Sequence, residues 1–197
     1  MKFLAIAAMT LDGKIAKNKD HLSTDWTSKE DRIFMRALLD KCDVIIVGNN
    51  TYKTAIKPLS KRNCIVFTKQ VPSPGEGMVR PARQRLEPKA TAGGERSNNG
   101  VYRKSENLLY VNPTKVDVKK LITKLGYQKA AILGGAQTYT YCLQNNMMDE
   151  LYLTVEPTVF GKGIDLFSPS KFSGALFKLI SIKKLNAQGS LLLRYKK

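Results

Sequence analysis

The chain contains very little histidine and cysteine. Among its 197 residues the one histidine is His21, which argues against a histidine-built metal site or a histidine-based nucleophilic triad. The three cysteines, Cys42, Cys64 and Cys142, are widely separated and lack the spacing of metal ligands. They predict reduced, mostly buried thiols and no bound metal.

Long hydrophobic runs are also missing. No apolar stretch approaches the length of a membrane span, and the N-terminal MKFLAIAAMT is interrupted by Asp12 too early to be a signal peptide. We therefore expect a cytoplasmic protein without membrane contact. The length suits one domain with a full hydrophobic core, so we expect a single domain over residues 1–197.

Acidic residues are scarce relative to basic ones. The chain has 33 lysines and arginines against 16 aspartates and glutamates, which gives a net charge of +17. A basic surface attracts polyanions, including nucleic acids, phosphorylated small molecules and a phosphate-bearing cofactor. Neither zinc-finger spacing nor an aromatic RNA-binding signature accompanies this charge. A solvated basic face is the simpler interpretation, and nucleic-acid binding stays open as the alternative.

Apolar runs that alternate with helical periodicities predict an α/β fold. Strands are expected at Lys2–Met9, Asp43–Val47, Cys64–Thr68, Leu108–Val111, Ala130–Leu133, Leu151–Thr158, Leu176–Leu185 and Ser190–Tyr195, and helices at Ser28–Leu39, Val116–Leu125 and Ala136–Leu143. Because strands alternate with helices over the first two thirds of the chain, the sheet is expected to be mostly parallel. Four residues join the last two strands, which predicts an antiparallel hairpin at the edge of the sheet.

One segment, from Pro72 to about Glu106, does not fit this pattern. It is rich in Pro, Gly, Ser, Asn, Arg and Glu, and it shows neither a strand period nor a helix period. It also has too few large apolar residues to build a core of its own. We therefore expect a disordered insertion at about residues 72–106 rather than a second domain.

The expected helix at Ser28–Leu39 carries a candidate functional acid. Ser28 suits the N-cap position, and Asp31 lies in the acidic first turn. The buried face of this helix is expected to carry Ile33, Phe34, Ala37 and Leu38. Asp31 lies at the edge of that face, which leaves two interpretations open. It is either a carboxylate that stabilises the helix start or a functional acid held near the core.

Two glycine turns each follow an apolar strand and begin a helix. One contains Gly134 and Gly135, and the other begins at Gly48. Glycine allows a ligand to approach the backbone closely, and the exposed amides of a helix start favour an anion such as a dinucleotide pyrophosphate. A tight turn without a ligand is the alternative. Arg62 and Lys69 bracket a neighbouring strand as candidate anion-binding cations, or as ordinary surface cations.

Eight segments, in order and spacing, resemble the dihydrofolate reductase superfamily. They are IAAMTLDGKIA, WTSKED, VIIVGNNTY, PLSKRNCIVFT, AILGGAQTY, DELYLTVEP, GKGIDLF and GSLLLRYKK. The resemblance covers nearly the whole chain except residues 72–106 and implies a three-layer fold with helices on both faces of the sheet. MTLDGKIA, WTS and GSLLLRY resemble the reductase domain of bacterial riboflavin biosynthesis. GNNTYKTAIKPLSKRNCIV is more similar to dihydrofolate reductase itself, so both branches stay open.

The resemblance also implies roles for individual residues. The cofactor-binding positions are Ala8, Asp12, Ile15, Gly48, Asn49, Asn50, Thr51, Thr68, Lys69, Gly134, Gly135, Ala136 and Gln137. Asp31 matches the family's substrate-protonating or substrate-anchoring acid, with Thr154 as its hydrogen-bonding partner, while Trp26 and Arg62 match substrate-binding positions. Asn49 stands where folate reductases commonly have an arginine for the 2'-phosphate of NADPH. Lys69 is then the candidate cation for that phosphate.

The implied function is hydride transfer from NADPH, with NADH as the alternative cofactor, to a pyrimidine or pteridine substrate. One branch reduces 5-amino-6-(5-phosphoribosylamino)uracil in riboflavin biosynthesis, and the other reduces dihydrofolate. The riboflavin branch also implies a homodimer. A non-catalytic polyanion-binding protein on the same fold is the third alternative.

Overall fold

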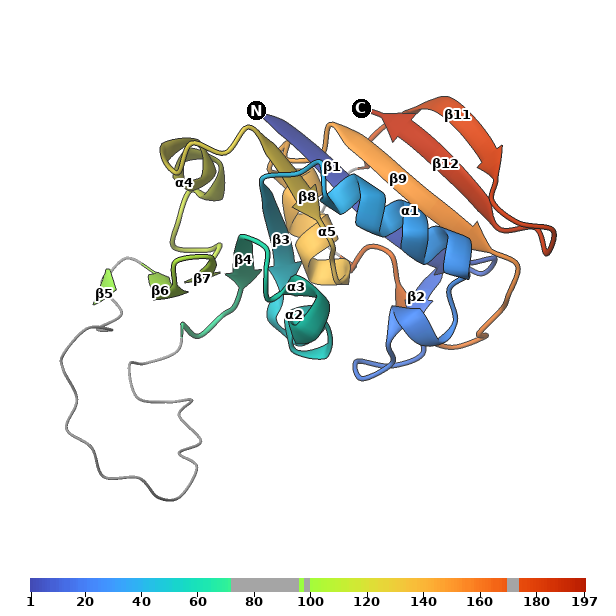
Figure 1. Ribbon diagram of the computed structural model, residues 1–197, viewed down its shortest axis with the longest axis horizontal. Coiled ribbons are helices and arrows are strands. Elements are labelled where there is room, and N and C mark those ends of the chain that lie inside the picture. The colour runs from blue at the N-terminus through green and yellow to red at the C-terminus, as the bar shows by residue number, and fades with distance from the viewer. Residues whose placement is uncertain (72–95, 98–99, 170–173) are drawn as a thin grey trace, which may run out of the picture.

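The computed structural model describes residues 1–71, 96–97, 100–169 and 174–197, arranged as shown in Figure 1. Within these residues, ten strands form one sheet in the order β11-β12-β9-β1-β8-β3-β4-β7-β6-β5, and β2 pairs with β10 separately. The strands are β1 (Lys2–Thr10), β2 (Lys14–Ala16), β3 (Val44–Gly48), β4 (Cys64–Phe67), β5 (Arg96–Ser97), β6 (Val101–Ser105), β7 (Leu108–Val111), β8 (Lys129–Ile132), β9 (Glu150–Glu156), β10 (Ile164–Asp165), β11 (Lys178–Lys184) and β12 (Leu191–Lys196). The helices are η1 (Ser23–Asp25), α1 (Lys29–Leu39), α2 (Asn49–Thr54), α3 (Ile56–Leu59), α4 (Val118–Lys124) and α5 (Ala136–Gln144).

The middle of the sheet is parallel and both of its edges are antiparallel. The parallel pairs are β1 with β8 and β9, β3 with β8 and β4, and β4 with β7. At one edge β9, β12 and β11 run antiparallel, which confirms the predicted C-terminal hairpin. At the other edge β7, β6 and β5 also run antiparallel. The sequence did not predict this second antiparallel edge.

The second edge lies partly in the segment that was expected to be a disordered insertion. There β6 pairs with β7, so that Val101 lies opposite Val111 and Tyr102 opposite Tyr110. A β-branched and an aromatic side chain that pair with a buried strand are sufficient to place a short strand beside β7. The prediction is therefore wrong for the C-terminal end of residues 72–106. Residues 72–95 and 98–99 lie outside the described residues.

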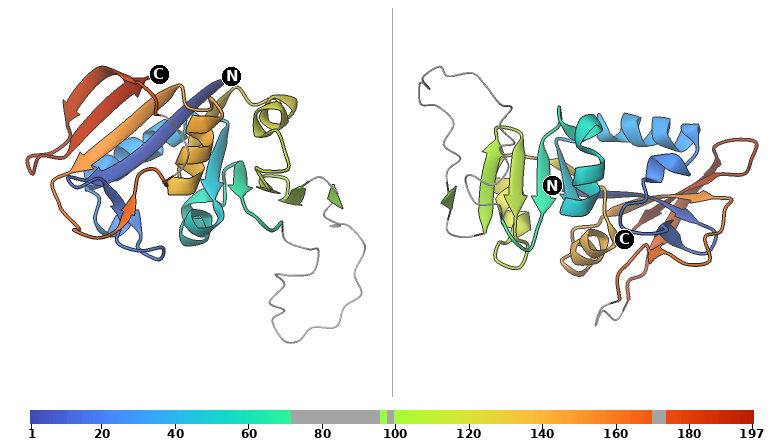
Figure 2. Two further views of the ribbon diagram at one scale, coloured as in Figure 1. Left: turned by 180° about the vertical axis from the view of Figure 1, so that it is seen from behind. Right: turned by 90° about the horizontal axis from the view of Figure 1, so that it is seen from below.

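Helices cover both faces of the sheet, which gives three layers with a core on each side (Figure 2). Neighbouring side chains of β1 point to opposite faces, so Phe3 belongs to one core and Leu4 to the other. The first core includes Ile122 of α4 and Leu143 of α5, and the second includes Leu38 of α1. Because both faces are covered, the central strands consist of uninterrupted runs of apolar residues in the sequence. The predicted three-layer α/β fold is confirmed.

The N-terminus of α1 forms as predicted, but its buried face differs. Ser28 is the N-cap, and its Oγ accepts a hydrogen bond from the backbone N–H of Asp31 at 3.2 Å. The prediction of the buried face is wrong in part, because Ile33 is 54% exposed and Ala37 is also exposed. The helix is rotated so that Asp31 lies on the buried face. A buried carboxyl group is costly unless it is bonded or used, so this rotation favours a functional acid.

The three cysteines are free, and Cys64 and Cys142 are buried while Cys42 is partly exposed. This confirms the prediction of mostly buried thiols. Among the described residues, we find no helix that is both long enough and apolar enough to cross a membrane.

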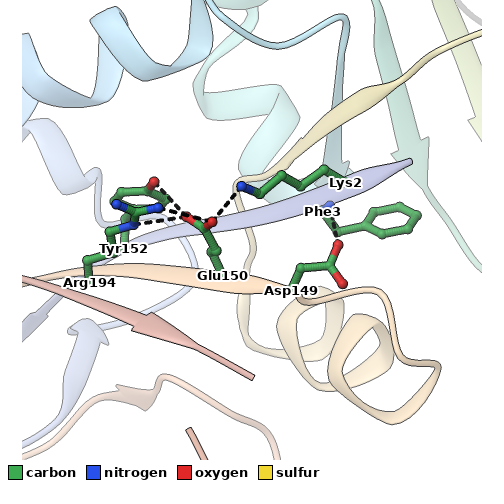
Figure 3. Close-up of polar contacts among 6 residues, drawn as sticks. All are labelled: Lys2, Phe3, Asp149, Glu150, Tyr152 and Arg194. Carbon is green, nitrogen blue, oxygen red and sulfur yellow. Dashed lines mark hydrogen bonds and ion pairs between the residues drawn. The ribbon is translucent and has the colours of Figure 1, made fainter. Parts of the chain in front are cut away.

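Glu150, at the start of β9, fastens three strands to one another (Figure 3). Its carboxylate accepts hydrogen bonds from Arg194 Nε of β12 at 3.0 Å and from the Tyr152 hydroxyl at 2.7 Å, and it lies 2.5 Å from Lys2 Nζ of β1. Burial alone would raise the pKa of Glu150, but its bonds with Arg194, Lys2 and Tyr152 together lower the pKa to about 2. The network therefore ties β1, β9 and β12 together at one end of the sheet.

Candidate functional site

A cleft of about 1060 Å³ lies at the carboxyl ends of the parallel strands. Its walls include Ala8 near the end of β1, Gly48 at the end of β3, Thr68 after β4, and Gly135 after β8. Open α/β sheets place their ligands at this end, because the loops that follow neighbouring strands meet there. The volume is that of a site for a dinucleotide and a small substrate rather than for a single small ligand.

The two glycine turns meet at the floor of the cleft. The backbone N–H of Gly48 donates to the carbonyl oxygen of Gly134 at 2.6 Å. A side chain on Gly48 would place its Cβ 2.9 Å from Thr138 Oγ1, and a side chain on Gly134 would collide with the ring of Tyr139. Gly134 also has a φ of +83°, a conformation that L side chains rarely adopt. The contact between the two turns therefore requires glycine at both positions.

The start of α5 presents free backbone amides to the cleft. Gly135 is the N-cap and contributes no side-chain hydrogen bond, and the next two residues, Ala136 and Gln137, line the cleft. The first amides of a helix have no partner within the helix, and together with the helix dipole they favour an anion. Gly135 thus opens onto a candidate anion site, whereas Gly134 serves the packing of the turn.

Asp31 reaches the cleft from α1 and is only 6% exposed. Burial raises the pKa of Asp31, and the negative charge of Glu156 raises it further, while hydrogen bonds with Thr154 and Thr27 act in the opposite direction. The net direction is upward, so Asp31 keeps its proton to a higher pH than an exposed aspartate does. A raised carboxyl pKa in a cleft is a common property of general acids.

Cations dominate the charge of the cleft. The described residues that line it include the cationic side chains of Lys19, Arg32, Arg36, Arg62 and Lys69, and among the described lining residues Asp31 is the one carboxylate. Two of the arginines already have partners: Arg32 donates to the Thr24 carbonyl oxygen at 2.5 Å, and Arg62 forms an ion pair with Asp40. The field of the cleft favours ligands with several phosphates.

Most of the predicted site residues line this cleft. They are Ala8, Ile15, Asp31, Gly48, Asn49, Asn50, Thr51, Arg62, Thr68, Lys69, Gly135, Ala136 and Gln137. Thr68 and Lys69 also form hydrogen bonds within the protein. The Thr68 hydroxyl donates to the Gln70 carbonyl oxygen at 2.7 Å, and the Lys69 carbonyl oxygen accepts from Asn112 Nδ2 at 2.8 Å. The loops after β4 and β7 are thereby joined.

Four predicted site residues are not among the residues that line the cleft. Asp12 instead holds a neighbouring loop, because its carboxylate accepts from the backbone N–H of Gly161 at 2.8 Å. Trp26 packs edge-on against Phe160, with ring centroids 5.1 Å apart. Gly134 belongs to the turn described above. Thr154, on β9, is 1% exposed and forms a hydrogen bond with Asp31, which does line the cleft.

Some of the lining residues were not predicted from the sequence: they belong to the loop that contains Lys19 and Thr24, and to two further parts of the cleft. One is the wall formed by Met35 and Arg36 of α1. It was not predicted because the buried face of this helix had been assigned to other residues. The other is the loop after β7, Asn112–Pro113–Thr114, in which Asn112 Oδ1 accepts from Thr114 Oγ1 at 2.8 Å. The rule that parallel strands end at the site would have found this loop, since β7 was correctly predicted and polar residues follow it directly.

This sheet, with helices on both faces and a ligand-sized cleft at the carboxyl ends of its strands, has the fold of dihydrofolate reductase. A dihydrofolate reductase from Enterococcus faecalis complexed with NADP(H) matches with a TM-score of 0.60 at 18% identity, over 99% of this chain and 95% of that chain. Proteins of riboflavin biosynthesis are also similar. One from Shewanella sp. PV-4 matches with a TM-score of 0.70 at 18% identity, over 100% of this chain and 98% of that chain.

A third solved structure is that of a diaminohydroxyphosphoribosylaminopyrimidine deaminase/5-amino-6-(5-phosphoribosylamino)uracil reductase from Thermotoga maritima. It matches with a TM-score of 0.62 at 16% identity, over 99% of this chain and 56% of that chain. The chain matches the family model of the RibD C-terminal domain over residues 2–190 and therefore belongs to that family. The predicted superfamily is confirmed, and of its two branches the match supports the riboflavin branch.

Proposed function

We propose that this protein is an NADPH-dependent reductase of riboflavin biosynthesis that acts on 5-amino-6-(5-phosphoribosylamino)uracil. The observation that carries the proposal is the cleft itself, in which one protonatable carboxyl group, Asp31, faces a wall rich in lysine and arginine. A substrate with a ribose phosphate and a cofactor with three phosphates would both suit that charge. Membership of the RibD C-terminal domain family supports the same reaction.

The residues of the cleft fit a dinucleotide cofactor. The free amides of Ala136 and Gln137 would bind the pyrophosphate, next to the turn at Gly48. Lys69 is exposed beside Thr68 and would pair with the 2'-phosphate that distinguishes NADPH from NADH. Ala8 and Ile15 would form the apolar wall beside the nicotinamide. When bound, this cofactor supplies the hydride.

The role of the protein in the chemistry would be to orient and to protonate. The ribose C1' of the substrate accepts a hydride in its ring-opened imine form and becomes a ribitylamine, and the imine nitrogen needs a proton. Asp31 would hold that proton, directly or through a water molecule, because its pKa is raised by burial. Thr154 would fix the orientation of the carboxyl group from β9.

Absorbance at the nicotinamide band tests this function. We expect the purified protein to oxidise NADPH when 5-amino-6-(5-phosphoribosylamino)uracil is added and to leave dihydrofolate unreduced. Reduction of dihydrofolate alone would assign the protein to the other branch. If calorimetry detects no binding of either NADPH or NADH, both reductase hypotheses are wrong, and the polyanion-binding protein becomes the favoured hypothesis.

Cofactor choice is tested separately with Lys69→Ala. Loss of one exposed charge-assisted contact should weaken NADPH binding by about fivefold to tenfold, or about 1 kcal/mol, while NADH binding stays unchanged. Lys57→Ala, which removes an exposed lysine outside the lining residues, is the matched control. An equal loss for both cofactors would show that Lys69 does not contact the 2'-phosphate.

We also propose that the protein is a homodimer joined through β11. This strand lies at the end of the sheet, and all its side chains are exposed, including Leu179, Ile180 and Ile182. An edge strand with exposed apolar side chains is a template for pairing with a second chain. Light scattering should give a dimer for the unmodified protein and a monomer for Ile182→Lys. A monomeric unmodified protein would contradict the proposal.

A further inference from the structure

Glu156, at the far end of β9, links two parts of the molecule that are distant in sequence. Its Oε1 accepts a hydrogen bond from the backbone N–H of Ser28 at 2.7 Å, and its Oε2 accepts one from the Ser190 hydroxyl. Glu156 is 4% exposed and Ser190 is 1% exposed. Both oxygens act as acceptors, which is the bonding pattern of an ionised carboxylate.

Each of these two contacts leads to a defined structure. Ser28 is the N-cap of α1 and binds the N–H of Asp31, so Glu156 holds the helix turn that carries the acid. Ser190 directly precedes β12 in the hairpin turn, and its hydroxyl also accepts from Asn186 Nδ2 at 2.9 Å. A continuous chain of hydrogen bonds therefore runs from the C-terminal hairpin through Glu156 to the first turn of α1.

The charges around Asp31 come from three elements. Glu156 of β9 contributes negative charge, and Arg32 of α1 contributes positive charge. Tyr139 of α5 is also close, since the charge of Asp31 helps raise the pKa of this tyrosine, which burial raises first. The remaining polar contacts of Asp31 are with Thr27 and Thr154, which are neutral. Within the described part of the chain, Glu156 is therefore the buried acidic group that acts on Asp31, whereas Glu30, its neighbour in the same helix turn, is exposed.

We propose that Glu156 is a positioning residue for the reaction: it fixes the first turn of α1 through Ser28 and places a second buried negative charge beside Asp31. This inference rests on the proposed function of Asp31 as the acid. Glu156 itself is not among the residues that line the cleft, so it acts through Asp31 rather than on the substrate. Its charge favours the protonated form of Asp31, which is the form needed by a proton donor.

The substitution Glu156→Gln removes the negative charge of the side chain but keeps its size and shape. The amide oxygen of glutamine can still accept from the Ser28 N–H, and the amide group can donate to the Ser190 hydroxyl, which also accepts hydrogen bonds. We expect this variant to fold and to bind NADPH with unchanged affinity. Glu30→Gln is the matched control, because Glu30 lies in the same helix turn and contacts the same hairpin through Asn186 but is exposed.

The first measurement needs no activity. The Asp31 carboxyl group is titrated by carbon-13 NMR in the protein without ligands, with its signal assigned by comparison with Asp31→Asn. Asp31 should lose its proton at a lower pH in Glu156→Gln than in the unmodified protein, and at an unchanged pH in Glu30→Gln. An unchanged Asp31 titration in folded Glu156→Gln overturns the inference, whether or not the reductase function holds.

The second measurement is the pH profile of kcat. If Asp31 donates a proton, kcat falls as the pH rises through the pKa of Asp31. In Glu156→Gln this fall should begin at a lower pH, so kcat decreases several-fold at neutral pH and approaches the unmodified value at acidic pH. A purely structural role would lower kcat equally at all pH values, which would contradict the proposal. Complete absence of turnover in the unmodified protein would instead refute the proposed function.

A second variant covers the case in which Glu156→Gln does not fold. Ser190→Ala removes one donor to Glu156 and leaves the Ser28 contact in place. With one of its two bonds lost, the Glu156 carboxylate is held less firmly beside Asp31 and its charge acts less strongly, so the Asp31 titration should again move to lower pH. An Asp31 titration equal to that of the unmodified protein would overturn the inference by this route as well.

Discussion

Strand β9 carries a buried glutamate at each end, and the two differ in their surroundings. Glu150, at the start, is bonded to Lys2, Tyr152 and Arg194. Glu156, at the end, is bonded to a backbone N–H and a hydroxyl, and within the described residues no cation pairs with it. The charge of Glu150 is neutralised by Lys2 and Arg194, whereas the charge of Glu156 acts on Asp31.

The two ends of β9 therefore differ in what their charge does: one end holds strands together, and the other acts on the pKa of Asp31. Cations around Glu150 lower its pKa to about 2, so that it stays ionised and holds β1, β9 and β12 together. At the other end burial raises the pKa of Asp31, and the uncompensated Glu156 raises it further. If a cation also neutralised Glu156, burial would still raise the pKa of Asp31, but the added effect of the Glu156 charge would be lost. Three substitutions test this contrast.

Asp31→Asn should have the largest effect on activity. Loss of the proton donor is expected to lower kcat/KM by about 100-fold or more, because general acids commonly contribute that much. Stability should not fall. The raised pKa of Asp31 means that the folded state binds its proton more tightly than the unfolded state, so the carboxyl group costs stability as pH rises above the unfolded value of 3.8. A retained kcat/KM at neutral pH would remove Asp31 from the mechanism.

Glu150→Gln should have the largest effect on stability. Removing one partner of a buried, ion-paired network is expected to lower the free energy of unfolding by roughly 2–4 kcal/mol, as measured by urea denaturation. The half-exposed Lys2 and Arg194 argue for the lower part of that range. kcat should stay unchanged, since Glu150 is not among the residues that line the cleft. Tyr152→Phe, which removes one neutral donor, is the milder control.

The same variant has a defined pH signature. The pKa of Glu150 falls from 4.5 to about 2 on folding, so its contribution is fully present above pH 4.5 and is lost as the pH falls toward 2. The stability of the unmodified protein should therefore drop more steeply across that window than the stability of Glu150→Gln. Parallel curves would show that Glu150 does not titrate as the network implies.

Thr154→Val should have the smallest effect and the opposite sign to Glu156→Gln. Valine keeps the shape of threonine but removes the hydrogen bond that lowers the pKa of Asp31. Asp31 should then lose its proton at a higher pH, and the fall in kcat should move to higher pH. The cost in stability should be about 1 kcal/mol, the usual value for one buried hydrogen bond. A shift to lower pH would contradict the assigned contact.

The sequence predicted those features that depend on local patterns. The strand at Lys2–Met9, the Ser28 N-cap and the glycine turns all follow from neighbouring residues, and each is present. The rotation of α1 could not be predicted, because Asp31 and Ile33 lie on nearly opposite faces of the helix and the contacts that bury Asp31 come from distant parts of the chain. The contacts of Glu156 were missed for the same reason, since its partners Ser28 and Ser190 are far apart in the sequence.

The position of β1 in the sheet limits how early this strand can pair while the protein is being synthesised. This strand is synthesised well before its sheet neighbours β8 and β9, which lie far along the chain. Until then its apolar residues have no strand to pair with, and the forming protein depends on late, long-range closure. Thr154 and Glu156, which act on the pKa of Asp31, lie on β9 and are therefore synthesised together with this late neighbour of β1. The same strand thus completes both the pairing of β1 and the surroundings of Asp31.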